Sequence, residues 1–144
     1  MKVAEIKVSY SSNYGDVVKI TSSQKAYDLI IDYWNKDTIE LLEEVNIILL
    51  NRANRVLGIH SLSKGGISGT IVDIKLVLSI ALKCNASSLI MVHNHPSGQL
   101  TPSESDKNIT AKLKDACKTV DLVLLDHLII SKLNYYSFSD EDNL

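Results

Sequence analysis

Two histidines separated by a single residue, His93 and His95, follow a short apolar run at residues 88–92. In an extended segment the side chains of residues i and i+2 point to the same side, so both imidazoles can converge on one point at the end of a strand. Asp106 follows after a turn, near the start of a predicted helix. Two imidazole nitrogens and one carboxylate oxygen form a three-ligand metal set, which leaves a fourth tetrahedral position for water.

Zinc is the metal that this donor set favours, because imidazole and carboxylate ligands suit a borderline ion that accepts tetrahedral geometry. A water in the open position has a pKa of about 7, so hydroxide is available at neutral pH. Hydrolysis also needs a general base and a donor for the oxyanion. Ser103 lies on the same helical turn as Asp106, so its hydroxyl can face the same cavity. Glu43 and Glu44, at the mouth of an apolar run, are the candidates for the base.

Each of these residues has a simpler interpretation when it is taken alone. Ser103 and Asp106 also fit a capping box, in which the serine and the acid three residues later satisfy the first turn of a helix. Glu43 and Glu44 fit the solvated start of a strand. His127 lies in an apolar run, and is either a core histidine or a partner that orients a metal ligand. The combination of His-x-His, serine and aspartate at this spacing favours the metal site.

The hydrophobic pattern predicts the elements that position these residues. The N-terminal 40 residues are interpreted as a strand–helix extension of the domain, with strands at residues 3–10 and 17–20 and a helix from residues 21–23 to about 34. The remaining segments, which form the core at residues 41–144, are strands at 45–50, 55–62, 88–92, 122–130 and 135–138 and helices at 73–85 and 103–120. The helix at 73–85 is apolar almost all round, so we expect it to be buried. The predicted fold is α/β, with a mixed sheet wrapped around this central helix and further helices outside.

Composition limits the classes of protein to which the chain can belong. A length of 144 residues fits one domain, and 45% hydrophobic and 22% charged residues are ordinary for a globular protein. The net charge of −2 argues against direct DNA binding, and no apolar run approaches the length of a membrane span. Cys84 and Cys117 form no Cys-x-x-Cys pair, and we interpret them as reduced thiols of a cytoplasmic protein.

Residues 93–98, His-Asn-His-Pro-Ser-Gly, followed by Ser103 and Asp106, resemble the JAMM motif of JAB/MPN+ zinc metalloproteases. The Pro-Ser-Gly sequence and residues 125–130, Leu-Asp-His-Leu-Ile-Ile, resemble the RadC branch of bacterial proteins. The resemblance extends over about two thirds of the chain. It implies a sandwich of the JAB/MPN type, similar to that of cytidine deaminases.

The same resemblance implies roles for individual residues. Zinc would be bound by His93, His95 and Asp106, and Ser103 would assist the oxyanion. The family places its base glutamate at the start of the strand before the hairpin, which favours Glu43 over Glu44. Asn94, between the two histidines, should point away from the metal.

The function implied by the resemblance is that of a zinc-dependent hydrolase, of metallopeptidase or isopeptidase type, with a peptide or protein substrate that the sequence does not identify. One alternative is a non-catalytic zinc- or protein-binding module associated with DNA-repair or mobile-element proteins. Another is a phosphoesterase, since one metal and a water can serve that reaction. The exposed edge expected at residues 3–10 can also pair between two copies to form a homodimer.

Overall fold

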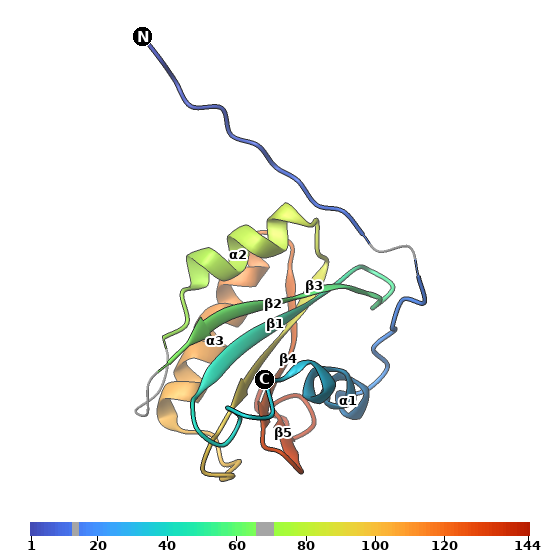
Figure 1. Ribbon diagram of the computed structural model, residues 1–144, viewed down its shortest axis with the longest axis vertical. Helices are drawn as coiled ribbons and strands as arrows, with labels where there is room; N and C mark the ends of the chain where they lie inside the picture. Colours follow the sequence, from blue (N-terminus) through green and yellow to red (C-terminus); the bar gives the residue numbers. More distant parts are fainter. Residues whose placement is uncertain (13–14, 66–70) are drawn as a thin grey trace.

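The computed structural model describes residues 1–12, 15–65 and 71–144, and its centre is a five-stranded mixed sheet with the strand order β2-β1-β3-β4-β5 (Figure 1). The central strand β3 pairs antiparallel with β1 and parallel with β4, while β2 and β5 form the antiparallel edges. The bounds of the elements are α1 (Ser23–Tyr33), β1 (Glu44–Leu50), β2 (Val56–Lys64), α2 (Ile74–Lys83), β3 (Ser88–Asn94), α3 (Glu104–Lys118), β4 (Val123–Ile130) and β5 (Tyr135–Ser137).

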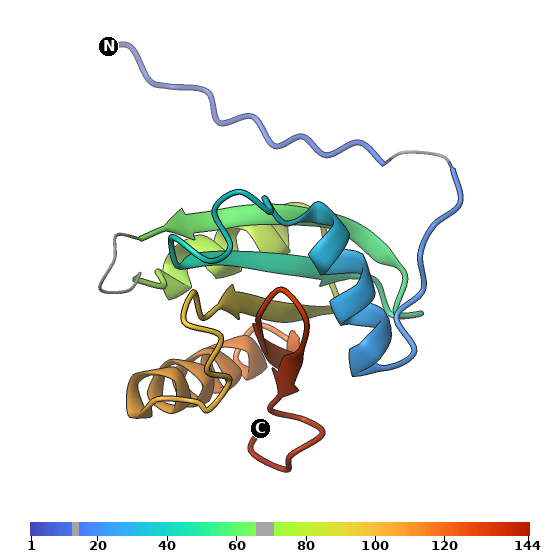
Figure 2. The same ribbon diagram turned by 60° about the horizontal axis from the view of Figure 1, so that its bottom comes forward.

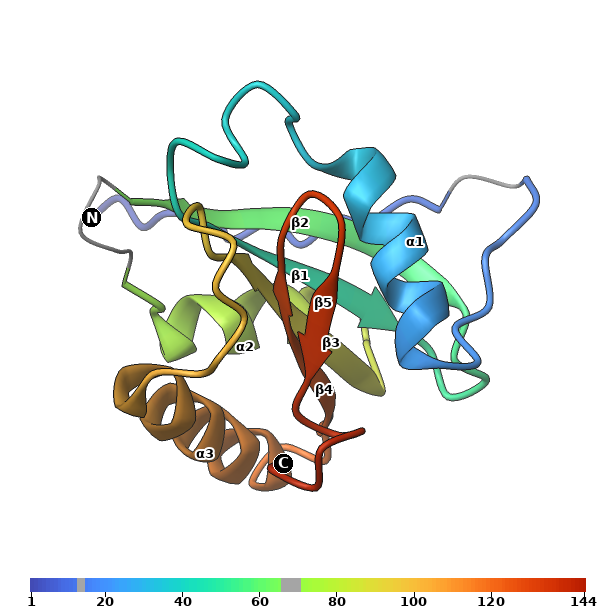
Figure 3. The same ribbon diagram turned by 90° about the horizontal axis from the view of Figure 1, so that it is seen from below.

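Helices cover both faces of the sheet, with α1 on one side and α2 and α3 on the other (Figure 3). Side chains alternate between the faces along each strand. On β1, Ile47 and Leu49 therefore lie in the core beneath α2 and α3, while Ile48 and Leu50 lie in the core beneath α1. All seven residues of β1 are buried, as expected for a strand covered on both faces. This alternation also decides to which face each polar residue at the strand ends belongs.

The mixed α/β class is confirmed, but helix α2 is less buried than its composition predicts. Only Val77 and Ala81 of this helix are buried. Leu76 and Leu82 remain 40% and 49% exposed. The helix forms the outer layer on its face of the sheet, so its outer side meets solvent although it carries leucine. The prediction of a helix buried all round is therefore wrong.

The predicted N-terminal strand at residues 3–10 does not form. Figures 1 and 2 both show residues 1–12 leading away from the domain, and Val3 and Ile6 are 85% and 88% exposed. The hydroxyl of Tyr10 donates a hydrogen bond to the carbonyl of Leu57 over 2.8 Å. An alternating pattern becomes a strand only where a neighbouring strand offers backbone partners, and this segment has none among the described residues. The short strand at 17–20 is reduced to a single bridge between Lys19 and Arg55.

The remaining sequence predictions about general organisation have mixed outcomes. Ser22 and Asp73 cap α1 and α2, in agreement with the helix starts that were predicted. Cys84 and Cys117 are both free thiols. Within the described ranges, the structure has no helix long and apolar enough to cross a membrane.

Candidate metal centre

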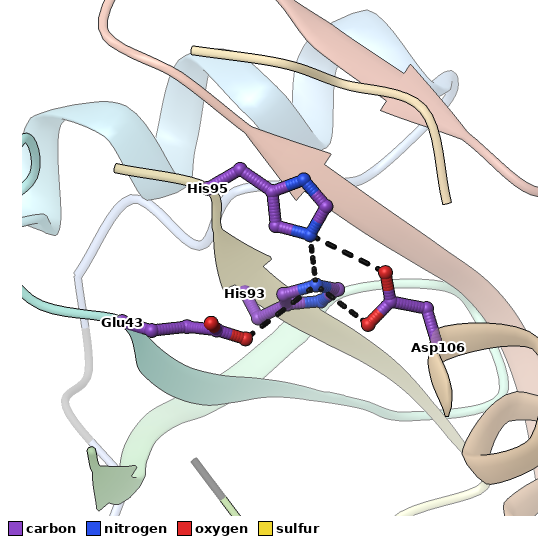
Figure 4. Close-up of side chains that lie close together, drawn as sticks. All are labelled: Glu43, His93, His95 and Asp106. Atoms are coloured by element: carbon purple, nitrogen blue, oxygen red, sulfur yellow. Dashed lines mark hydrogen bonds and ion pairs between the residues drawn. The ribbon is translucent and has the colours of Figure 1, made fainter. Parts of the chain in front are cut away.

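The ends of three elements meet beside the sheet on the face that carries α2 and α3. Strand β1 starts where its antiparallel neighbour β3 ends, so Val45 lies opposite His93. His95 follows β3, and its backbone N–H donates to the carbonyl of Ile130 over 3.0 Å. Helix α3 then brings the carboxylate of Asp106 back to the end of β3. Figure 4 shows the side chains of Glu43, His93, His95 and Asp106 converging from these elements.

The geometry of the cluster fits a tetrahedral metal ion. Nε2 of His93 lies 2.9 Å from Nε2 of His95 and 3.2 Å from Oδ1 of Asp106, and Nε2 of His95 lies 3.3 Å from Oδ2 of Asp106. Ligand bonds of 2.0–2.1 Å to a tetrahedral zinc would separate neighbouring ligand atoms by about 3.3 Å. The separations from His93 and His95 to the carboxylate, each to a different oxygen, are close to this value, and the separation of the two histidine nitrogens is slightly short. The three residues can therefore hold a metal ion with little rearrangement.

Hydrogen bonds behind the cluster give His93 the tautomer that a metal ligand needs. The hydroxyl of Thr110 donates to the backbone carbonyl of Asp106 over 2.6 Å and accepts from Nδ1 of His127, also over 2.6 Å. Nε2 of His127 then accepts from Nδ1 of His93 over 2.7 Å. This leaves the lone pair of His93 Nε2 facing the cluster. Burial, the largest cause, holds the pKa of His127 well below its usual value, in agreement with a neutral ring.

A tight turn fixes the tautomer of His95 in the same way. The backbone N–H of Gly98 donates to the carbonyl of His95 over 2.9 Å, and Gly98 adopts a φ of 81°, which favours glycine. The turn brings the carbonyl of Gln99 to within 2.5 Å of His95 Nδ1, which donates to it. The lone pair of His95 Nε2 is therefore also directed toward the cluster.

His127 fits both interpretations that its sequence context allowed, because it is buried against Phe138 and also accepts a hydrogen bond from His93, a candidate ligand. Thr110 was missed by sequence reasoning. The available signal was its position four residues after Asp106 on one face of a helix.

Replacing His127 with phenylalanine is expected to weaken zinc binding about 10–100-fold, because His93 would lose the acceptor that fixes its ring. The aromatic ring retains the stacking of His127 on Phe138, so the core should remain packed. Competition with a chelator of known affinity measures the change. His60→Phe, on the exposed surface of β2, is the control and should bind zinc as the wild type does. Equal affinities in the two variants would contradict the proposed role of His127.

Ser103 and Asp106 form the capping box that the sequence allowed, and they form it inside the cluster. Oγ of Ser103 accepts from the backbone N–H of Asp106 over 3.0 Å, and Oδ2 of Asp106 accepts from the backbone N–H of Ser103 over 2.8 Å. Because the hydroxyl oxygen acts as an acceptor in the cap, its hydrogen remains available to another group. Capping and a role at the metal site are therefore compatible, and the cap orients the carboxylate.

The charges of the cluster favour the binding of a cation. Burial raises the pKa of Asp106, but the contacts that protonated His93 and His95 would make with its carboxylate outweigh burial and hold this pKa well below its usual value. The hydrogen bond with Asp106 is the main cause that raises the pKa of His95. Asp106 is therefore an anion at neutral pH. A bound cation would replace the proton of His95 as its counter-charge.

The structure brings Glu43, and not Glu44, to the cluster. Oε1 of Glu43 lies 4.0 Å from Nε2 of His93, and its side chain is 23% exposed. Glu44, the next residue, belongs to the opposite face of the sheet, where it is buried and accepts a hydrogen bond from the hydroxyl of Thr38 over 3.3 Å. Among the described residues, Glu43, His93, His95 and Asp106 are the one group of metal-ligating side chains that gather in this way.

The cluster opens onto a cleft with a volume of about 910 Å³. Ser103 and all four residues of the cluster line this cleft, together with apolar side chains that include Val45, Met91 and Ile109. A cleft that combines these polar groups with apolar side chains is typical of a site for an organic substrate.

Comparison with known proteins places this site in context. A family model described as "RadC-like JAB domain" matches residues 20–144. A UPF0758 protein of Flavobacterium johnsoniae is 44% identical over 144 residues, which cover 96% of this chain and 61% of that protein. A UPF0758 protein of Streptococcus sanguinis is 45% identical over 97 residues, covering 67% of the chain and 43% of the relative. One of Streptococcus suis is 39% identical over 102 residues, covering 71% and 42%. The chain therefore spans less than two thirds of the length of these relatives.

Proposed function

The chain belongs to the RadC-like JAB domain family, and from this premise we propose that it is a zinc-dependent hydrolase of metallopeptidase or isopeptidase type. The observation that carries the proposal is the convergence of two imidazole lone pairs and one carboxylate, with the carboxylate of Glu43 beside them at 4.0 Å from His93. A site that only binds a metal needs the three ligands. A hydrolase also needs the fourth group.

His93, His95 and Asp106 would hold the zinc ion, which when bound supplies a Lewis acid and lowers the pKa of a bound water to about 7. Glu43 accepts the proton of the attacking water and returns it to the leaving amine. Its distance from His93 exceeds the ligand separations, which suits a base that does not itself bind the metal. The hydroxyl of Ser103 donates to the oxyanion of the tetrahedral intermediate.

A peptide or isopeptide bond is favoured over a phosphodiester. Two-metal phosphoesterases hold a second ion about 3.5–4 Å from the first, which requires a second set of ligands. The described residues contain one such set. The apolar side chains that line the cleft suit the side chains of a protein segment better than they suit a phosphate backbone.

The zinc content of the purified protein tests the proposal before any substrate is known. We expect one equivalent of zinc in the wild type and a loss of zinc in His95→Ala, which retains two of the three protein ligands. His60→Ala, away from the cluster, should retain the metal. A wild-type protein that binds no zinc at neutral pH, or a His95→Ala variant that still holds a full equivalent, would contradict the assignment.

A further inference from the structure

The residue between the two histidines makes contacts of its own on the other face of the sheet. The side chain of Asn94 is fully buried, and it points away from the metal cluster as the sequence predicted. Its Nδ2 donates to the carbonyls of Ile39 and Leu42, each over 2.7 Å, and its Oδ1 accepts from the backbone N–H of Glu44 over 2.7 Å. Both N–H groups and the oxygen of the amide are thus used within one short segment.

That segment, residues 35–44, leads from α1 into the first residue of β1, and we name it the strap. The carbonyl of Leu42 belongs to the peptide group just before Glu43, and the N–H of Glu44 belongs to the one just after it. Asn94 therefore holds the peptide groups on both sides of Glu43. The carbonyl of Glu43 accepts a further hydrogen bond from the N–H of Gly65 over 2.8 Å.

We propose that Asn94 is a positioning residue, which fixes Glu43 at its distance from His93 and His95. This inference rests on the proposed function. One side chain joins the strand that carries both histidine ligands to the segment that carries the base, although about 50 residues separate them in the sequence. A displacement of about 1 Å can cost a catalytic group 10²-fold in rate, so a rigid connection of this kind has a direct use.

The proposal predicts that replacing Asn94 alters the strap, whereas replacing another buried asparagine on the same face does not. Asn46 is the matched control. Asn46 lies on β1, on the same face of the sheet as Asn94, and is 3% exposed. Its Oδ1 has no hydrogen-bond partner in the described part of the chain. Replacing either asparagine with leucine preserves a branched side chain of similar size. In the described part of the chain, only the change at residue 94 removes hydrogen bonds from the strap.

Hydrogen–deuterium exchange of the full chain measures the effect on the strap directly. We expect peptides that cover residues 35–44 to exchange roughly tenfold faster in Asn94→Leu, because a buried backbone amide and two carbonyls lose their partner. Asn46→Leu should exchange like the wild type in this segment. Unchanged exchange of the strap in Asn94→Leu would overturn the proposal. If Asn94→Leu does not fold, Asn94→Asp retains the size and the acceptor but removes both donors, and the same expectation applies.

A second measurement connects the strap to the metal centre without a substrate. The protein is loaded with cobalt in place of zinc, and its visible absorption is followed as the pH is changed. The midpoint of this pH-dependent change should shift in Glu43→Gln. Asn94→Leu should shift it in the same direction, and the double variant should add little to Glu43→Gln alone, because both changes act through one carboxylate. Additive shifts would overturn the positioning role. No shift in Glu43→Gln would instead count against the base assignment of the proposed function, and the exchange experiment would still decide the role of Asn94 in the strap.

Discussion

Glu43→Gln is expected to retain a full equivalent of zinc and to lose hydrolytic activity by a factor on the order of 10²–10⁴, the contribution typical of a general base. Glutamine has the shape of glutamate but cannot accept the proton of the attacking water. The carboxylate of Glu43 lies 4.0 Å from His93, farther than the contacts among the three ligand residues, so its replacement should leave the ligand set intact. Zinc content and turnover of a peptide library, followed by mass spectrometry, measure both quantities in the same preparation.

Glu44→Gln is the matched control, because the same change is made one residue later on the opposite face of the sheet. It should leave turnover unchanged, apart from any effect of altering a buried side chain on stability. A Glu43→Gln variant that turns substrate over as the wild type does would exclude Glu43 as the base. It would favour the alternative of a zinc- or protein-binding module.

Asp106→Ala is expected to lose both zinc and turnover. The carboxylate approaches His93 and His95 to 3.2 Å and 3.3 Å, so its removal leaves two neutral ligands and no anionic one. The variant also loses half of the capping box at the start of α3. We therefore expect the free energy of unfolding of the metal-free protein to fall by roughly 1 kcal/mol as well.

Glu104→Ala provides the comparison for Asp106→Ala. Glu104 lies in the first turn of the same helix but is exposed, and its carboxylate contacts Lys107 instead of the histidines. Zinc content by elemental measurement and the unfolding midpoint in chelator separate the two effects. Asp106→Ala with an intact equivalent of zinc would show that Asp106 is not a ligand.

Local spacing in the sequence determined much of the candidate site. His93 and His95 share an origin at the end of one strand, and Ser103 and Asp106 share one turn of a helix. These relations depend only on the local geometry of a strand and of a helix, which is the same in any tertiary arrangement. The proximity of the candidate ligands His93, His95 and Asp106 could therefore be predicted, and the structure brings these three residues together.

The choice between Glu43 and Glu44 depends on how strands pair. Glu43 and Glu44 lie on opposite faces of the sheet where β1 begins. The register that places Val45 opposite His93 decides which of the two faces carries His93. The resemblance to a family favoured Glu43, and the register supplies the physical reason. Thr110 behind His127 likewise depends on the packing of α3 against β4.

Two sequence predictions, the strand at residues 3–10 and the buried helix α2, failed because a hydrophobic pattern does not show which neighbouring element will cover it. The alternating residues 3–10 have the composition of a strand, but a strand requires another backbone beside it. Helix α2 has the composition of a buried helix, but burial is decided by the layers that cover it. The sequence alone determined which side chains share an element and therefore which metal ligands are available. Only the tertiary structure decided which elements meet. It therefore decided that Glu43 lies beside the candidate ligands, which hydrogen bonds orient the histidines and which backbone groups Asn94 binds, because these contacts join residues that are far apart in the sequence.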